Sequence, residues 1–149
     1  MFQQITDQFA IGDETTRGRL QTLAQQGYKM VIDLCTAEEG KAIPENEVKE
    51  AGLALKRVPV STQSLNPVVV EQFIATAEQA NGPVYARCAS GRRAALMVFL
   101  TQATQHHWTN TQFFNHVEAA GFDCRSAPQL AAFAEDYLEK LQHTSGSEH

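Results

Sequence analysis

A cysteine, a glycine and two arginines lie within one short segment, Cys88-Ala89-Ser90-Gly91-Arg92-Arg93. The apolar run over 83–87 before it predicts a buried strand, and the apolar run over 94–105 after it predicts a buried helix. A tight loop between a strand and a helix can direct several backbone N–H groups into one concavity, where they and the helix dipole attract an anion. Because Gly91 supplies the backbone freedom that such a loop needs, the sequence predicts an anion-binding loop with a cysteine at its mouth.

The side chains of this loop are of the types that nucleophilic catalysis on an anionic group requires. The N–H groups and the positive end of the helix favour the thiolate form of Cys88, which is then a strong nucleophile. Arg93 is predicted to clamp an oxyanion through two hydrogen bonds, a geometry that lysine does not offer. The residues predicted to bind the same anion through their backbone are Ala89, Ser90, Gly91 and Arg92. A structural interpretation, in which Cys88 is only a small buried hydrophobe, stays open.

The elements that must position this loop alternate along the chain. Strands are predicted at a segment ending with 9–11 and at 30–35, 53–60 and 83–87. Helices are predicted at 16–26, 44–51, 67–80, 94–105, 109–121 and from 126 onward. This alternation predicts an α/β fold with a mostly parallel central sheet of about four to five strands, flanked by helices. Since ligands bind beyond the carboxyl ends of parallel strands, Cys88 falls where a site is expected.

Length, charge and cysteine content limit the possible environments and partners. The 149 residues predict a single domain over 1–143 followed by a disordered polar tail at 144–149. The net charge of −5 argues against nucleic-acid and membrane partners. The sequence shows neither a signal-peptide pattern nor an apolar stretch long enough to span a membrane. Together with three sparse cysteines, Cys35, Cys88 and Cys124, this predicts a cytoplasmic protein with reduced thiols. The oligomeric state stays open.

The segment Pro83-Val84-Tyr85-Ala86-Arg87-Cys88-Ala89-Ser90-Gly91-Arg92-Arg93-Ala94 resembles the active loop of a bacterial family of small phosphatase-like domains. These domains are described as beta-lactamase-hydrolase-associated and belong to the cysteine-dependent tyrosine and dual-specificity phosphatases. The resemblance extends to 9–12, 27–34, 58–60 and 119–123. It implies a phosphatase-like fold, with Cys88 as the nucleophile that forms a cysteinyl-phosphate and Arg93 as the phosphate clamp. The implied substrate is a phosphomonoester on a small molecule or a protein, with phosphotyrosine as one candidate. The side chain of Arg92 either guides this substrate or faces solvent.

The chain departs from the pattern of these phosphatases at the loop itself. Four residues, rather than the usual five, separate Cys88 from Arg93, and Arg87 stands where a histidine is usual. Ala94 follows the arginine, where a serine or threonine usually assists departure of the thiolate.

The segment 60–66 contains no aspartate to protonate a leaving group. General acid assistance is worth about 10²–10⁴-fold in rate, so activated leaving groups are predicted to react best. Asp33 is the candidate substitute among the predicted catalytic residues. Glu38 and Glu39 are further candidates, although both are better explained as solvated loop charges.

Two other functions fit the same loop. The form Cys-x-x-Gly-x-Arg is also that of many single-domain rhodaneses, in which the cysteine carries a persulfide and the partner is a sulfur donor. Alternatively, the domain binds anions or phosphorylated partners without turnover. Cys35 could form a disulfide with an oxidised Cys88, although a buried core thiol is the favoured interpretation. No cofactor motif is present, and His106 and His107 lack ligand spacing, so neither a cofactor nor a metal is predicted.

Overall fold

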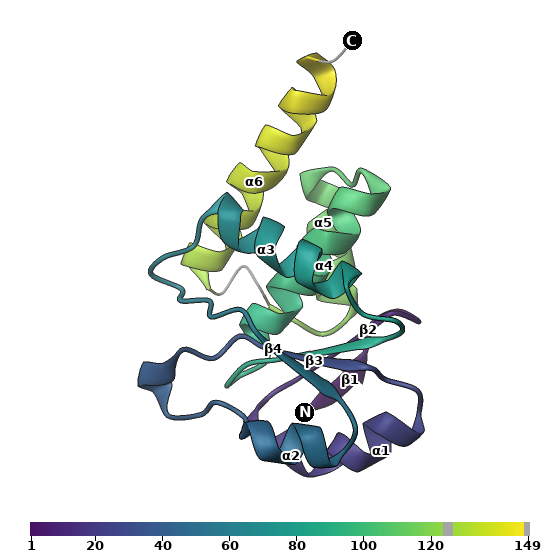
Figure 1. Cartoon of the computed structure of the whole chain (residues 1–149). Coiled ribbons are helices and arrows are strands. Elements are labelled where there is room, and N and C mark those ends of the chain that lie inside the picture. Colours follow the sequence, from purple (N-terminus) through teal and green to yellow (C-terminus); the bar gives the residue numbers. More distant parts are fainter. Residues whose placement is uncertain (124–126, 148–149) are drawn as a thin grey trace.

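A five-stranded sheet runs through the centre of the protein (Figure 1), and the computed structural model describes residues 1–123 and 127–147. Its strands are β1 (Phe2–Gln4), β2 (Phe9–Gly12), β3 (Met30–Asp33), β4 (Ala54–Arg57) and β5 (Val84–Arg87). They lie in the order β1-β2-β5-β3-β4, with β1 antiparallel to β2 and the other pairs parallel. The predicted α/β fold with a mostly parallel sheet is therefore confirmed.

Helices cover both faces of this sheet. In chain order they are η1 (Glu14–Arg19), α1 (Leu20–Gln25), η2 (Ala37–Glu39), α2 (Glu45–Glu50), α3 (Pro67–Glu78), α4 (Arg92–His106), α5 (Asn110–Ala119) and α6 (Pro128–Ser147). Figure 1 shows α1 and α2 on one face and α3 to α6 on the other. Residues 144–147, which were predicted to be a disordered tail, belong to α6. Cys124, residue 126 and residues 148–149 lie outside the described part of the chain.

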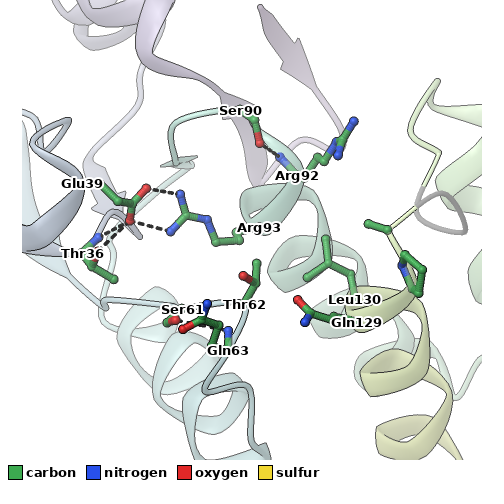
Figure 2. A pocket seen from close by; sticks show the side chains of 12 residues that line it. Thr36, Glu39, Ser61, Thr62, Gln63, Ser90, Arg92, Arg93, Gln129 and Leu130 are labelled. Atoms are coloured by element: carbon green, nitrogen blue, oxygen red, sulfur yellow. Dashed lines mark hydrogen bonds and ion pairs between the residues drawn. The ribbon is translucent and has the colours of Figure 1, made fainter.

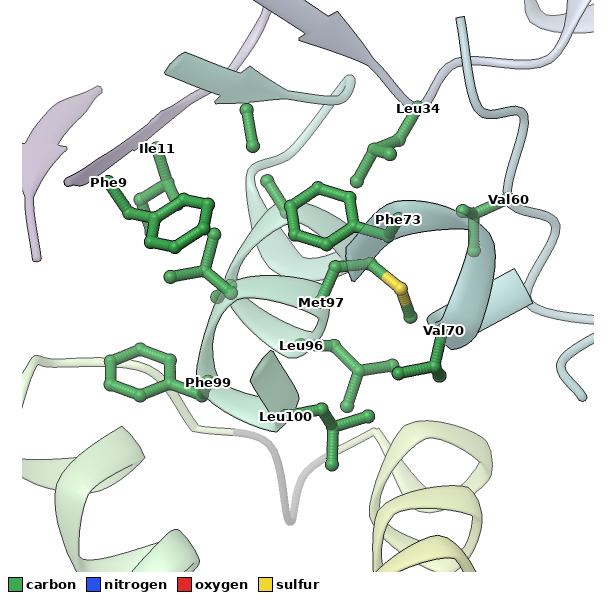
Figure 3. Close-up of a cluster of buried hydrophobic side chains, with 14 of the residues drawn as sticks. Phe9, Ile11, Leu34, Val60, Val70, Phe73, Leu96, Met97, Phe99 and Leu100 are labelled. Atoms are coloured by element: carbon green, nitrogen blue, oxygen red, sulfur yellow. The ribbon is translucent and has the colours of Figure 1, made fainter. Parts of the chain in front are cut away.

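The apolar residues of β2, β3 and β5 alternate between two cores, as side chains of a strand must. Ile11, Ile32 and Ala86 belong to the larger core beneath α3 to α6, and their neighbours Val31 and Tyr85 belong to the smaller core beneath α1 and α2. Figure 3 shows part of the larger core. Helix α4 is buried from 93 to 103 between the sheet and the other helices, so its first turn holds the loop before it in a fixed place.

None of the helices within residues 1–123 and 127–147 combines the length and the apolar character needed to cross a membrane.

Candidate active site

The loop between β5 and α4 is held by backbone hydrogen bonds to the end of β2 and to the segment that follows it. Its first residue, Cys88, donates its backbone N–H to the carbonyl of Gly12 at 3.3 Å, and the carbonyl of Ala89 accepts from Glu14 N at 3.2 Å. Gly91 adopts a left-handed conformation with φ of 87° at the N-terminus of α4, which is the conformation that favours glycine. In this conformation the N–H of Gly91 donates to the Cys88 sulfur at 3.0 Å. The structure thus places a backbone donor and a helix N-terminus at the cysteine, an arrangement that stabilises negative charge on sulfur.

Arg93 extends from the first turn of α4 to a glutamate that precedes it by 54 residues. Its Nη1 and Nη2 donate to Glu39 Oε2 at 2.8 Å and to Oε1 at 2.5 Å, and Nη1 also donates to the carbonyl of Val60 at 2.7 Å. The same glutamate accepts from the backbone N–H of Thr36 at 2.6 Å and from its hydroxyl at 2.9 Å. Figure 2 shows Arg93 and Thr36 converging on this carboxylate.

These contacts fix the charge of Glu39. The hydrogen bonds from Arg93 lower the pKa of Glu39 to about 2, aided by those from Thr36, and the same glutamate raises the pKa of Arg93. The expectation that Glu39 is a solvated loop charge is therefore wrong. Glu39 is an ionised acceptor at neutral pH, so in this pairing it has no proton to give to a leaving group.

The free energy of unfolding at acidic pH should depend on the Glu39–Arg93 pair. Because the pKa of Glu39 falls from 4.5 to about 2 on folding, the pair stabilises the protein above about pH 4.5, and this contribution is lost as the pH falls toward 2. At neutral pH we expect Glu39→Gln to lower the free energy of unfolding by about 2 kcal/mol. Urea unfolding at a series of pH values should show this difference shrinking between pH 4.5 and pH 2. The exposed neighbour Glu38 provides the control, since Glu38→Gln should cost little at any pH; a Glu39 effect independent of pH would contradict the assignment.

Asp33, the predicted catalytic acid, lies at the centre of a row of charges. The strand register pairs it with Arg57 on one side and Arg87 on the other. Its Oδ2 accepts from Arg57 Nη1 at 3.0 Å and its Oδ1 from Arg87 Nη1 at 3.1 Å. The backbone N–H groups of Cys35 and Ile43 donate to the same carboxylate at 3.1 and 2.8 Å.

This placement does not match the role predicted for Asp33. The side chain is fully buried and does not belong to the residues that line the pocket described below. Its oxygens already accept hydrogen bonds from four donors, which is about their full capacity. The arrangement instead joins the carboxyl ends of β3, β4 and β5, directly beside Cys88.

Arg87, the residue that replaces the usual histidine, connects this row to the loop that carries Glu39. Its Nη1 donates to the carbonyl of Lys41 at 3.0 Å and lies 3.8 Å from the Cys35 sulfur, while its buried Nε has no hydrogen-bond partner among the described residues. Burial raises the pKa of Cys35 to about 12, so its thiolate is scarce at neutral pH. Cys35 and Cys88 are both free buried thiols in the structure.

Arg87 and Arg57 allow a matched test of how burial affects the contribution of an ion pair to stability. The side chain of Arg87 is 2% exposed, whereas that of Arg57 is 41% exposed, and both contact Asp33. We expect Arg87→Met to lower the free energy of unfolding by about 3 kcal/mol, because it leaves a buried carboxylate short of a partner. Arg57→Met should cost less than about 1 kcal/mol, because water screens and replaces the exposed contact. Denaturant unfolding of both variants measures these changes in the free energy of unfolding. Equal changes would show that burial does not determine how much each arginine contributes to stability.

A pocket of about 530 Å³ opens beside the loop. Its walls are formed by Thr36, Glu39, Ser61, Thr62, Gln63, Ser90, Arg92, Arg93, Ala127, Pro128, Gln129 and Leu130. The structure therefore brings three of the predicted loop residues, Ser90, Arg92 and Arg93, to one cavity. Cys88 is fully buried and, like Ala89 and Gly91, is not part of the wall. The charged side chains of the wall, within the described part of the chain, are the ionised Glu39 and the two arginines.

Sequence comparison places the chain among known proteins. Residues 1–105 match the family described as "Beta-lactamase hydrolase-like protein, phosphatase-like domain". The beta-lactamase hydrolase-like protein of Xylella fastidiosa (strain 9a5c) is 26% identical over 155 residues, covering 93% of this chain and 36% of that protein. The chain spans about a third of the length of the curated relatives that it matches.

Comparison with solved structures agrees on the fold. A DUF442 protein from Shewanella putrefaciens CN-32, described as a candidate phosphatase, has a TM-score of 0.77 at 24% identity, covering 93% of this chain and 89% of that chain. A TpbA variant from P. aeruginosa, solved in complex with pTyr, has a TM-score of 0.78 at 11% identity, covering 96% and 88%. At these identities the likeness shows a shared fold. Since the family match covers more than half of the sequence, the chain belongs to the family of phosphatase-like domains of beta-lactamase hydrolase-like proteins.

Proposed function

We propose that this domain is a cysteine-dependent phosphatase that hydrolyses phosphomonoesters through a cysteinyl-phosphate on Cys88. The observation that carries the proposal is the Gly91 N–H at 3.0 Å from the Cys88 sulfur, in the loop that also presents Arg93 to a polar pocket. In the first step the Cys88 thiolate attacks phosphorus, a sulfur–phosphorus bond forms and the ester oxygen leaves with its electron pair. In the second step water attacks phosphorus, and inorganic phosphate leaves as the thiolate is restored.

Glu39 leaves Arg93 able to bind a phosphate group. A guanidinium has five N–H donors, and the contacts to Glu39 and Val60 use three of them. The Nε–H and the second hydrogen on Nη2 remain, and they form the parallel pair that binds two oxygens of one phosphate. Glu39 is therefore assigned as a positioning residue that fixes the plane of this guanidinium, and Asp33 as a positioning residue for the strand ends.

The rate of the proposed reaction should depend on the acidity of the leaving group of the substrate. The only carboxylate in the described wall of the pocket, Glu39, is ionised, and Asp33 does not reach that wall. A phenol with electron-withdrawing groups leaves without a proton, whereas an alkoxide does not. The pTyr bound to TpbA supports aryl phosphates, including phosphotyrosine, as the substrate class.

A second candidate function is sulfur transfer. The short spacing, with Gly91 N–H aimed at the sulfur, also suits a persulfide, and this reaction requires no proton donor. The Cys88 thiolate would attack the outer sulfur of thiosulfate, form a sulfur–sulfur bond and release sulfite.

Parallel assays separate the two functions. The protein and its Cys88→Ser variant are incubated with para-nitrophenyl phosphate, and separately with thiosulfate followed by cyanide. The proposal predicts nitrophenolate release that the variant lacks, and little thiocyanate. Thiocyanate formation without nitrophenolate would establish sulfur transfer instead. Neither product, together with phosphate binding to the wild type, would show a domain that binds anions without turnover.

A further inference from the structure

A second cavity, of about 240 Å³, lies between α4, α5 and α6. One side of it is formed by apolar side chains, those of Ala95, Leu96, Phe113, Val117, Phe122 and Leu130, and the rest of the wall by Gly121 and the polar residues Ser90, Arg92 and Asp123. The apolar part of this wall favours a non-polar group over water.

The two cavities adjoin, because Ser90, Arg92 and Leu130 line both of them. In Figure 2 the side chains of Arg92 and Arg93 leave the start of α4 in different directions, Arg93 toward Glu39 and Arg92 away from it. Arg92 is exposed, and no carboxylate within the described ranges forms an ion pair with it. A ligand that places an anionic group on Arg93 can therefore extend past Arg92 into apolar surroundings.

We propose that the second cavity binds the non-polar part of the substrate, which makes the substrate an amphiphilic aryl phosphomonoester. This inference rests on the proposed binding of phosphate at Arg93. Binding sites for small molecules commonly combine mainly apolar walls with a few polar groups that fix orientation. Each buried methylene group raises affinity by about four-fold, so the affinity of an alkyl probe should rise with the length of its alkyl group.

Calorimetric titration of the whole chain with methylphosphonate and hexylphosphonate tests this inference, since both carry the same charged group on a carbon that hydrolysis does not release. We expect hexylphosphonate to bind at least about ten-fold more tightly than methylphosphonate. Ala95→Leu, which fills the cavity from α4, should reduce this ratio to below about three-fold. Phe122→Ala removes a half-buried apolar side chain from the opposite wall of the cavity and should also reduce the ratio. Ala119→Leu makes the same change at an exposed site on α5 outside both cavities and should keep the full ratio.

Equal affinities of the two phosphonates for the wild type would overturn the second cavity as a substrate site and leave the proposed phosphatase intact. A ten-fold preference that survives in both cavity variants would overturn it too. If neither phosphonate bound, the proposed phosphate site itself would fail, and the inference with it.

Discussion

Replacing Cys88 with serine is expected to lower the turnover of para-nitrophenyl phosphate by at least about 10³-fold. A serine hydroxyl is a much weaker nucleophile than a cysteine sulfur, so the proposed nucleophile is lost while the shape of the loop is kept. Initial rates at saturating substrate measure the effect. Cys35→Ser is the matched control, because the Cys35 sulfur is also buried but lies beside Arg87, whereas the Cys88 sulfur accepts from Gly91 N at the start of α4, and it should retain most of the activity. Comparable losses in the two variants would mean that the thiol of Cys88 has no special role.

Arg93→Lys is expected to lower kcat/KM for the same substrate by about 10²–10³-fold. Lysine keeps the positive charge but presents a single point of contact, so it cannot hold Glu39 and two phosphate oxygens at once. Steady-state kinetics measure the loss, and inhibition by inorganic phosphate should weaken in parallel. Arg92→Lys makes the same exchange at an exposed side chain and should cost less than about ten-fold. If both exchanges had equal effects, charge alone, rather than the paired geometry of Arg93, would account for binding.

The sheet could be predicted largely from the alternation of apolar runs and turns. The runs at 30–35 and 83–87 contain β3 and β5, and the strands end at Asp33 and Arg87, where polar side chains begin. The sequence predicts one opening strand that ends at 9–11, whereas the structure has two, β1 and β2. Strand β1 is only three residues long and forms by pairing with β2, so its own sequence carries little signal.

In the candidate site, too, features set by neighbouring residues could be predicted, whereas contacts between residues far apart in the sequence could not. The loop at 88–93 could be predicted because strand, glycine and helix follow one another in sequence. The partner of Arg93 could not, because Glu39 is 54 residues away. The capping-box pattern Thr36-x-x-Glu39 distinguishes Glu39 from Glu38, but it predicts a contact with Thr36 and not with Arg93. Asp33 and Arg87 carry a sequence signal, since each of these charges ends an apolar strand, whereas Arg57 ends the largely exposed β4. Knowing that they pair required the strand order and register.

The measurement that tests the central claim most directly is mass spectrometry of the peptide that contains Cys88, after the reaction with para-nitrophenyl phosphate is quenched in acid during turnover. Acid traps the enzyme species that accumulates before the second step. The account predicts one added phosphoryl group on Cys88, absent from Arg93→Lys under the same conditions. An unmodified Cys88 while nitrophenolate is being released, or a phosphoryl group on any other residue, would contradict it.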